Sequence, residues 1–229
     1  MIEVWAAALE RCETDPDIKV IVVTGSGAAF CAGGDVGDQQ ARTGGDSVER
    51  KNFLHRHVHR IPLLMDRIDK PTIAAVNGAA RGAGMDMALM CDLRIMAESA
   101  TLAESYISVG LTAGDGGAYY LPRLVGTARA LELLWTGRTV TAAEAERMGL
   151  VNRVVPLDQL MASTYELAHT IARQPFEAVR ALKRAVHQGL SMPLAAHLDM
   201  MSSQIAILAD TAEHRERIAA FLHRDRGAK

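Results

Sequence analysis

Aromatic side chains are scarce in this sequence. Phenylalanine, tryptophan and tyrosine together make up 4% of its 229 residues, whereas hydrophobic residues as a whole make up 49%. The core must therefore be built from aliphatic side chains and alanine. Charge of one sign is not in excess either, because 25 lysines and arginines face 27 aspartates and glutamates. A net charge of −2 gives no electrostatic reason to expect nucleic acid or an anionic membrane as a partner.

Cysteine is also rare, and its three positions are Cys12, Cys31 and Cys91. An odd number without a C-x-x-C pair indicates neither a disulfide framework nor a redox motif, and it suits a reducing compartment. No apolar run is long enough to predict a membrane span, and no secretory leader is visible. We therefore expect a cytoplasmic protein that has no membrane partner.

What the sequence does contain is two glycine-rich turns, each after an apolar, strand-like run. The first turn, Gly25–Asp35, follows Ile21–Thr24, and the second, Asn77–Asp86, follows Ile73–Val76. Glycine lets backbone approach a ligand closely, and unpaired turn amides can point at negative charge. The second turn leads into a predicted buried helix, whose first amides have no partner within the helix. Two such turns facing each other would bind a developing oxyanion; alternatively, the glycines only permit tight strand-to-helix packing.

Seven segments, in unbroken order between about Ile18 and Pro156, resemble the enoyl-CoA hydratase/isomerase (crotonase) superfamily. They are Phe30–Asp35, Pro71–Gly78, Cys91–Ile95, Val109–Leu111, Gly114–Gly117, Thr136–Arg138 and Ala142–Val151. The resemblance implies that the backbone amides of Gly34 and Ala83 hold the oxygen of an acyl-CoA thioester. The coenzyme A would then lie along the first turn, near Ala32, Gly34, Asp35 and Val36. Coenzyme A is part of the substrate, so the resemblance implies no separate cofactor, and we expect no metal.

Alternating strand, turn and helix signals predict an α/β core over residues 1–156, and residues 157–229 read as a helical region. By resemblance, the core is a spiral of β-β-α turns, and the C-terminal helices join subunits into a homotrimer or a dimer of trimers. The family normally begins with a strand ahead of its first helix. This chain begins inside that helix, so we expect an N-terminal strand segment to be missing.

Two acid–base positions depart from the family pattern. Hydratases of this family use two glutamates, and the matching positions hold Asp86 and Tyr106. Asp86 can still ionise and move a proton, although its side chain is one methylene shorter. Tyr106, with an ordinary pKa of about 10, is a donor at neutral pH and a poor base. The two-carboxylate arrangement that hydration needs is therefore broken unless Glu104 or Asp115 substitutes.

These two carboxylates have simpler explanations. Glu104 would share a strand face with Tyr106, but we favour a solvent-exposed position for it. Asp115 stands between glycines, where turn geometry alone accounts for an aspartate, and we count it as a candidate substrate-binding residue. Three histidines near residue 57 have no cysteine or glutamate beside them to complete a metal site.

The leading interpretation is an acyl-CoA enzyme of the hydratase/isomerase type that stabilises a thioester enolate with backbone amides. Gly34, Ala83, Asp86 and Tyr106 are its candidate catalytic residues. Two alternatives remain open. One is an isomerase or hydrolase that uses the same oxyanion pocket with a single carboxylate. The other is a non-catalytic subunit that binds acyl-CoA or serves in assembly.

Overall fold

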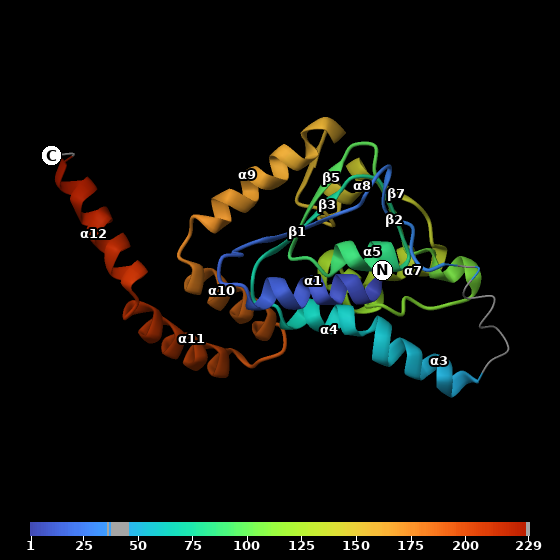
Figure 1. Ribbon diagram of the computed structural model, residues 1–229, viewed down its shortest axis with the longest axis horizontal. Coiled ribbons are helices and arrows are strands. Elements are labelled where there is room, and N and C mark those ends of the chain that lie inside the picture. Colours follow the sequence, from blue (N-terminus) through green and yellow to red (C-terminus); the bar gives the residue numbers. More distant parts are fainter. Residues whose placement is uncertain (36, 38–45, 228–229) are drawn as a thin grey trace.

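The computed structural model describes residues 1–35, 37 and 46–227, with side chains as far as residue 222. Two four-stranded sheets form the centre of the molecule (Figure 1). The first sheet has the order β1-β3-β5-β8 and is parallel throughout; its strands are Ile21–Thr24, Thr72–Val76, Leu93–Ala97 and Arg153–Val155. The second has the order β2-β4-β6-β7, and its strands are Ala29–Cys31, Ala79–Arg81, Thr101–Ala103 and Val140–Thr141. Its last pair, β6 with β7, is antiparallel.

The chain alternates between the two sheets, because β1, β3 and β5 lie in the first and β2, β4 and β6 in the second. Helical segments separate the strand pairs. Before and between the strands lie α1 (Ile2–Thr14), α3 (Ser47–Phe53), the π-helix η1 (Leu54–Val58), α4 (Arg60–Arg67), α5 (Ala83–Leu89), the 3₁₀-helix η2 (Ser105–Val109), α6 (Gly117–Val125), α7 (Thr127–Thr136) and α8 (Ala142–Arg147). This repetition is the predicted spiral of β-β-α turns.

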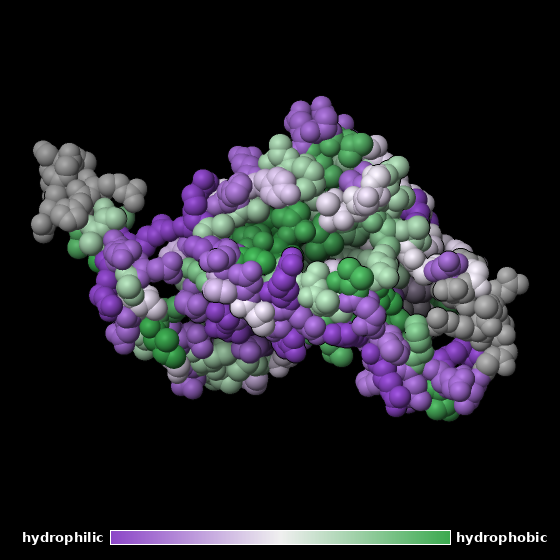
Figure 2. Space-filling model, in the orientation of Figure 1, coloured by the Kyte–Doolittle hydropathy of each residue, from purple (hydrophilic) through white to green (hydrophobic). Residues whose placement is uncertain are grey.

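Strand β3 lies at the centre of the hydrophobic core. All five of its residues are buried, as expected for a central strand of a parallel sheet covered on both faces. The largest buried side chains around it are aliphatic, as the composition predicts, and include Ile73, Met85, Ile95 and Met96. Strand β1 is at the edge of this sheet, and Figure 2 shows an apolar area near it in the middle of this face.

The last part of the chain is helical, as predicted. After the 3₁₀-helix η3 (Leu157–Gln159) come α9 (Leu160–Ala172), α10 (Phe176–Gly189), α11 (Leu194–Ala209) and α12 (Ala212–Gly227). Pro175 and Pro193 stand immediately before α10 and α11, so each is placed where a helix begins. Helix α9 packs on β1, β3 and β5, whereas α11 and α12 extend away from the body (Figure 1).

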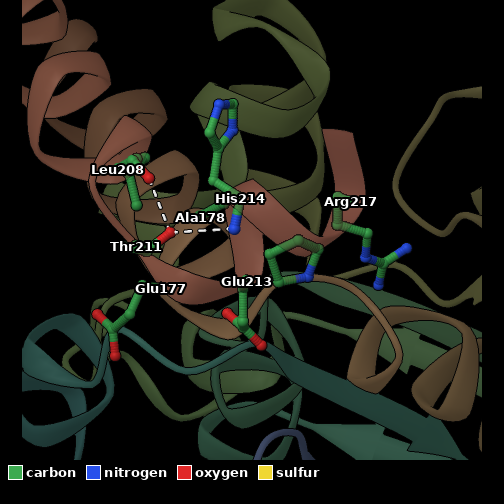
Figure 3. Close-up of a pocket in the computed structure, with 8 residues that line it drawn as sticks. Glu177, Ala178, Leu208, Thr211, Glu213, His214 and Arg217 are labelled. Carbon is green, nitrogen blue, oxygen red and sulfur yellow. Dashed lines mark hydrogen bonds between the residues drawn. The ribbon is translucent and has the colours of Figure 1, made fainter. Parts of the chain in front are cut away.

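The junction of α10 and α12 holds a small pocket of about 100 Å³ (Figure 3). Thr211 organises this junction, because its hydroxyl donates to the Leu208 carbonyl at 2.7 Å and accepts from the His214 amide at 3.2 Å. Glu213 accepts a hydrogen bond from the Phe176 amide at 3.1 Å. The pocket therefore belongs to the packing of the helical region. Within the described part of the chain, no helix is both long and apolar enough to cross a membrane.

Candidate active site

The two glycine-rich turns predicted from the sequence lie against each other. A Cβ atom at Gly33 would lie 2.6 Å from the Arg81 carbonyl oxygen and 3.7 Å from the Ala83 amide nitrogen. A Cβ atom at Gly84 would lie 2.1 Å from the Cys31 carbonyl oxygen. Only glycine fits at either position, and the φ of +93° at Gly33 also disfavours other residues. Backbone-to-backbone contact therefore fixes how the turns sit relative to each other.

Helix α5 begins in this contact. Gly82 is its N-cap residue and Ala83 its first residue, so the Ala83 amide has no carbonyl acceptor within its own helix. Ala83 is half-buried and Gly34 is exposed, whereas the following helix residues Gly84, Met85 and Asp86 are buried. The N-terminus of α5, which carries a partial positive charge, therefore reaches the protein surface beside the first glycine turn.

The side chain of Asp86 belongs to the first turn of α5 and is fully buried. Tyr106, from η2, donates its phenol hydrogen bond to Asp86 Oδ2 at 2.7 Å, and Asp115 Oδ2 lies 3.3 Å from the same hydroxyl. The Tyr106 ring also lies close to Gly82, since a Cβ there would be 3.5 Å from Cε2. The phenol thus connects the start of α5 with two carboxylates.

A third carboxylate, Glu104, faces Asp86 from the end of β6, and it is 1% exposed. We expected Glu104 to be exposed, and that expectation is wrong. Glu104 and Tyr106 also do not share a strand, contrary to our expectation, since β6 ends at Ala103 and a 3₁₀-helix follows. The turn of this helix lets Glu104 and Tyr106 both approach Asp86, although the two residues do not lie on one face of a strand.

Gly117 makes room for the two buried carboxylates. A Cβ atom at this position would lie 2.3 Å from Asp86 Oδ1 and 2.7 Å from Glu104 Oε1. These oxygens therefore converge on the space that any other side chain would fill. Among the described residues, the buried side-chain atoms without a hydrogen-bond partner are Asp86 Oδ1, Glu104 Oε1 and Glu104 Oε2.

Burial governs the protonation of this cluster. It raises the pKa of Asp86 to about 6, although the hydrogen bond from Tyr106 lowers it. Burial and the nearby Asp86 charge raise the pKa of Glu104 to about 9. Burial also raises the pKa values of Asp115 and Tyr106. Near neutral pH, Asp86 is therefore mainly ionised, while Glu104 and Tyr106 keep their protons.

A groove of about 400 Å³ opens beside this cluster. It is lined from the π-helix η1, α4, the loop that leads into α6 and α6 itself, and its residues include His55, His59, Asp66, Asp115, Tyr119 and Tyr120. His59 Nε2 lies 3.1 Å from the Gly114 carbonyl oxygen, and its charge lowers the pKa of Asp115 against the effect of burial. In the described part of the chain, no three histidine, cysteine or acidic side chains gather as metal ligands.

The structure brings most of the residues predicted for the site into one region. Ala83, Asp86, Tyr106 and Asp115 are connected by the contacts above. On the first turn, Ala32, Gly34 and Asp35 are exposed, and Val36 lies outside the described residues.

Sequence reasoning named Glu104 as a possible substitute for the second carboxylate but expected it to be exposed, and it missed Gly117. One signal was available for Glu104, because it directly follows the apolar pair Leu102-Ala103 and lies two residues after Leu102 in an extended segment. Residues two apart in a strand face the same way, so Glu104 shares the inward side of Leu102. No comparable signal marks Gly117, since its role depends on side chains from two other elements.

Comparisons with known proteins agree with this geometry. The family model for enoyl-CoA hydratase/isomerase matches residues 1–227. The chain is 38% identical to the "Probable enoyl-CoA hydratase echA8" of Mycobacterium bovis, over 98% of this chain and 84% of that protein. It is 34% identical to 4-chlorobenzoyl coenzyme A dehalogenase-1 of an Arthrobacter species, over 93% of this chain and 78% of that protein. The crystal structure of an enoyl-CoA hydratase from Bacillus anthracis superposes with a TM-score of 0.90 at 33% identity, covering 97% of this chain and 85% of that one.

Proposed function

The chain belongs to the enoyl-CoA hydratase/isomerase family, and from that premise we propose that it forms and quenches the enolate of an acyl-CoA thioester between its two glycine turns. It is an acyl-CoA-processing enzyme of the crotonase type, which leaves the non-catalytic alternative without support. The relatives include a named hydratase and a named dehalogenase. The reaction must therefore be argued from the side chains of this chain.

The observation that carries the proposal is the contact between the two turns. The Ala83 amide nitrogen would lie 3.7 Å from a Cβ at Gly33, the residue before Gly34, and this closeness supports the amides of Gly34 and Ala83 as a pair of donors. A thioester oxygen held between them would gain charge as the enolate forms, and both donors would strengthen at that moment. Removing one such donor costs about 10²–10³ in rate in other enzymes.

Asp86 supplies the base in this proposal. Its carboxylate is ionised near neutral pH, yet a pKa of about 6 makes it basic enough to accept a proton from the carbon next to the thioester carbonyl. Tyr106 donates to Asp86 and is only half-buried, so its hydroxyl is the group that hydrogen-bonds the substrate or a water molecule. Asp115 binds the substrate at the outer side of the phenol.

The arrangement favours reactions that need a single base. Hydration needs two groups, a base that takes a proton from water and an acid that protonates the α-carbon of the substrate. Tyr106 occupies the position of the second glutamate, and a phenol whose pKa is raised by burial is a poor base for water. A single-carboxylate isomerase is therefore the second candidate function. Both candidates share the enolate and its two backbone donors, and neither requires a metal or a separate cofactor.

The coenzyme A moiety is proposed to lie along the exposed residues Ala32, Gly34 and Asp35, with the acyl group directed toward the groove beside Asp115. The chain is proposed to assemble as a homotrimer or a dimer of trimers through its C-terminal helices. That proposal is supported by large apolar side chains on α10, α11 and α12 that are at least 48% exposed, namely Leu182, Val186, Leu190, Leu194, Leu198, Ile205, Ile207, Ile218, Phe221 and Leu222.

Deuterium exchange at the carbon next to the carbonyl of butyryl-CoA tests this function without assuming one reaction. We expect the wild-type protein in D₂O to incorporate deuterium. Asp86→Asn should lower the rate by about 10²–10⁴-fold because it removes the base, while calorimetry shows retained binding. Ala83→Pro should lower the rate by about 10²–10³-fold, because proline lacks the amide donor but is tolerated at the first position of a helix.

An Ala83→Ser variant, which keeps the amide, is the matched control and should retain exchange. The proposal fails if several acyl-CoA chain lengths give no binding, or if Asp86→Asn and a folded Ala83→Pro variant exchange at the wild-type rate.

A further inference from the structure

Glu104 is a buried carboxylate that the reaction above does not use. It is 1% exposed, and it faces the fully buried Asp86 across the space left by Gly117. A lone buried charge is costly, and a buried polar atom without a partner costs roughly 1–3 kcal/mol. The local packing nevertheless places two acidic side chains together, so their protonation must make the arrangement stable.

Counting donors leads to a single protonation state. If both groups were ionised, neither could donate to the other, and Asp86 Oδ1 and both oxygens of Glu104 would lack partners. One proton on Glu104 removes the second charge and supplies the donor that Asp86 Oδ1 lacks. Asp86 Oδ2 already accepts the phenol hydrogen bond of Tyr106.

The proton belongs on Glu104 because the surroundings treat the two groups differently. Asp86 accepts from Tyr106 and lies in the first turn of α5, where the helix dipole favours an anion. Glu104 has neither advantage, and the neighbouring charge of Asp86 raises its pKa further. Burial accordingly raises the pKa of Glu104 to about 9, well above that of Asp86.

We propose that Glu104 is a positioning residue that keeps its proton at neutral pH and donates it as a hydrogen bond to Asp86, which holds Asp86 ionised as the base. This inference rests on the proposed function only where it concerns the rate. Glu104 does not touch the substrate; it sets the charge and the orientation of the carboxylate that does. Glu104 does not stand at the position of the family's second acid, which Tyr106 occupies two residues further on.

Other ionisable groups face the pair from each neighbouring element. Tyr106 comes from η2 and Asp115 from the loop before α6. The charge of Asp86 also raises the pKa of Tyr120 in α6. His59, between η1 and α4, lowers the pKa of Asp115. Since Asp115 is joined to the pair through the Tyr106 hydroxyl, its titration must be separated from that of Glu104 by substitution.

Infrared spectroscopy tests the protonation without substrate. We expect a band of a protonated carboxyl group in the wild-type protein at pH 7.5 that is lost on titration through about pH 9, near the pKa of Glu104. Glu104→Gln should lack this band. Glu98→Gln, which changes an exposed glutamate nearby in the chain, should keep it. A wild-type protein without the band, or a Glu104→Gln variant that retains it, overturns the proposal.

The pH profile of butyryl-CoA exchange provides the second readout. In Glu104→Gln the amide can still donate to Asp86 but cannot ionise, so the loss of rate near pH 9 should disappear while the rise near pH 6 remains. In Glu104→Leu no donor is left, and the rise should move upward by at least one pH unit. If both variants titrate like the wild-type protein, Glu104 has only a structural role. Failure of the exchange assay itself would overturn the proposed function, whereas the infrared titration would still decide the state of Glu104.

Discussion

At the scale of single residues, the acid–base cluster depends on neutral groups as much as on charged ones. Tyr106 replaces a carboxylate at the centre of the site, and its hydroxyl contacts both Asp86 and Asp115. A glutamate at this position would add a fourth carboxylate to the two buried ones and the half-buried Asp115. The phenol instead stabilises Asp86 in its ionised form. Exchanging Tyr106 for glutamate alone would therefore create repulsion rather than restore a hydratase.

Tyr106→Phe should destabilise the protein more at pH 8 than at pH 5. The pKa of Asp86 is raised in the folded state to about 6, so folding favours its protonated form, and this contribution is lost as pH rises through 6. Without the phenol donor the ionised form becomes still less favourable. We expect a loss of about 2–3 kcal/mol in the free energy of unfolding at pH 8 and about 1 kcal/mol at pH 5.

Urea unfolding at the two pH values measures this difference. Tyr119→Phe changes an exposed tyrosine, 52% accessible, and should have little effect at either pH. An equal loss for Tyr106→Phe at both pH values would show that the phenol does not stabilise the charge of Asp86.

At the scale of elements, the regular strands and helices were predictable and their meeting points were not. The apolar run at Ile73–Val76 and the buried helix after Gly82 follow from local pattern, and the structure contains both. The glycine turns also pointed to the region where the structure gathers the candidate residues Ala83, Asp86 and Tyr106. In contrast, the burial of Glu104 depends on α5 and α6 packing over the end of β6. Contacts between distant segments of this kind leave little trace in a single sequence.

The connection between α10 and the first sheet offers a test at the same scale. Asp92, in the segment that leads into β5, accepts hydrogen bonds from the Thr72 amide at 2.8 Å and the Thr72 hydroxyl at 2.9 Å, and it pairs with Lys183 of α10 at 2.8 Å. Burial raises its pKa, but hydrogen bonds from His187 and Lys183 outweigh this effect and leave the pKa below its usual value.

Asp92→Asn should lower the free energy of unfolding by about 3 kcal/mol at pH 7, because it leaves the nearly buried Lys183 without its anion. A lowered folded-state pKa stabilises the fold above the unfolded pKa of about 4, and this contribution is lost as pH falls. The difference in the free energy of unfolding between variant and wild type should therefore become smaller at acidic pH.

Thermal unfolding from pH 3 to pH 7 measures this trend. Asp158→Asn, an exposed change, serves as the control, and a difference independent of pH would contradict the account.

At the scale of the whole molecule, the helical end of the chain is incompletely covered. Helix α11 has no buried residue, and Figure 1 shows α11 and α12 projecting from the body. Ile205 and Phe221 are 63% and 59% exposed. Two long helices that expose side chains of this size need another surface to cover them. The prediction of an α/β body with an associating tail was available from sequence, but the direction of the tail was not.

Sedimentation at micromolar concentration should show a trimer or a pair of trimers. The double variant Ile205→Glu with Phe221→Glu should sediment as a monomer, because each charge would be buried in the interface. Leu157→Glu, at an exposed position before α9, should assemble normally. A wild-type monomer under these conditions would refute assembly through the tail.

The contact between the two glycine turns has a consequence for how such an enzyme can change over evolutionary time. The groups proposed to hold the thioester belong to the backbone and are fixed by Gly33 and Gly84, so side-chain substitutions elsewhere leave them in place. The groups proposed to move protons are side chains on α5, η2 and the loop before α6, and each can be exchanged separately. Carbonyl activation is thus inherited as a constant, while reaction type is free to diverge one residue at a time. An ancestral hydratase could acquire a tyrosine at position 106 and a buried glutamate at 104 without losing its hold on the substrate.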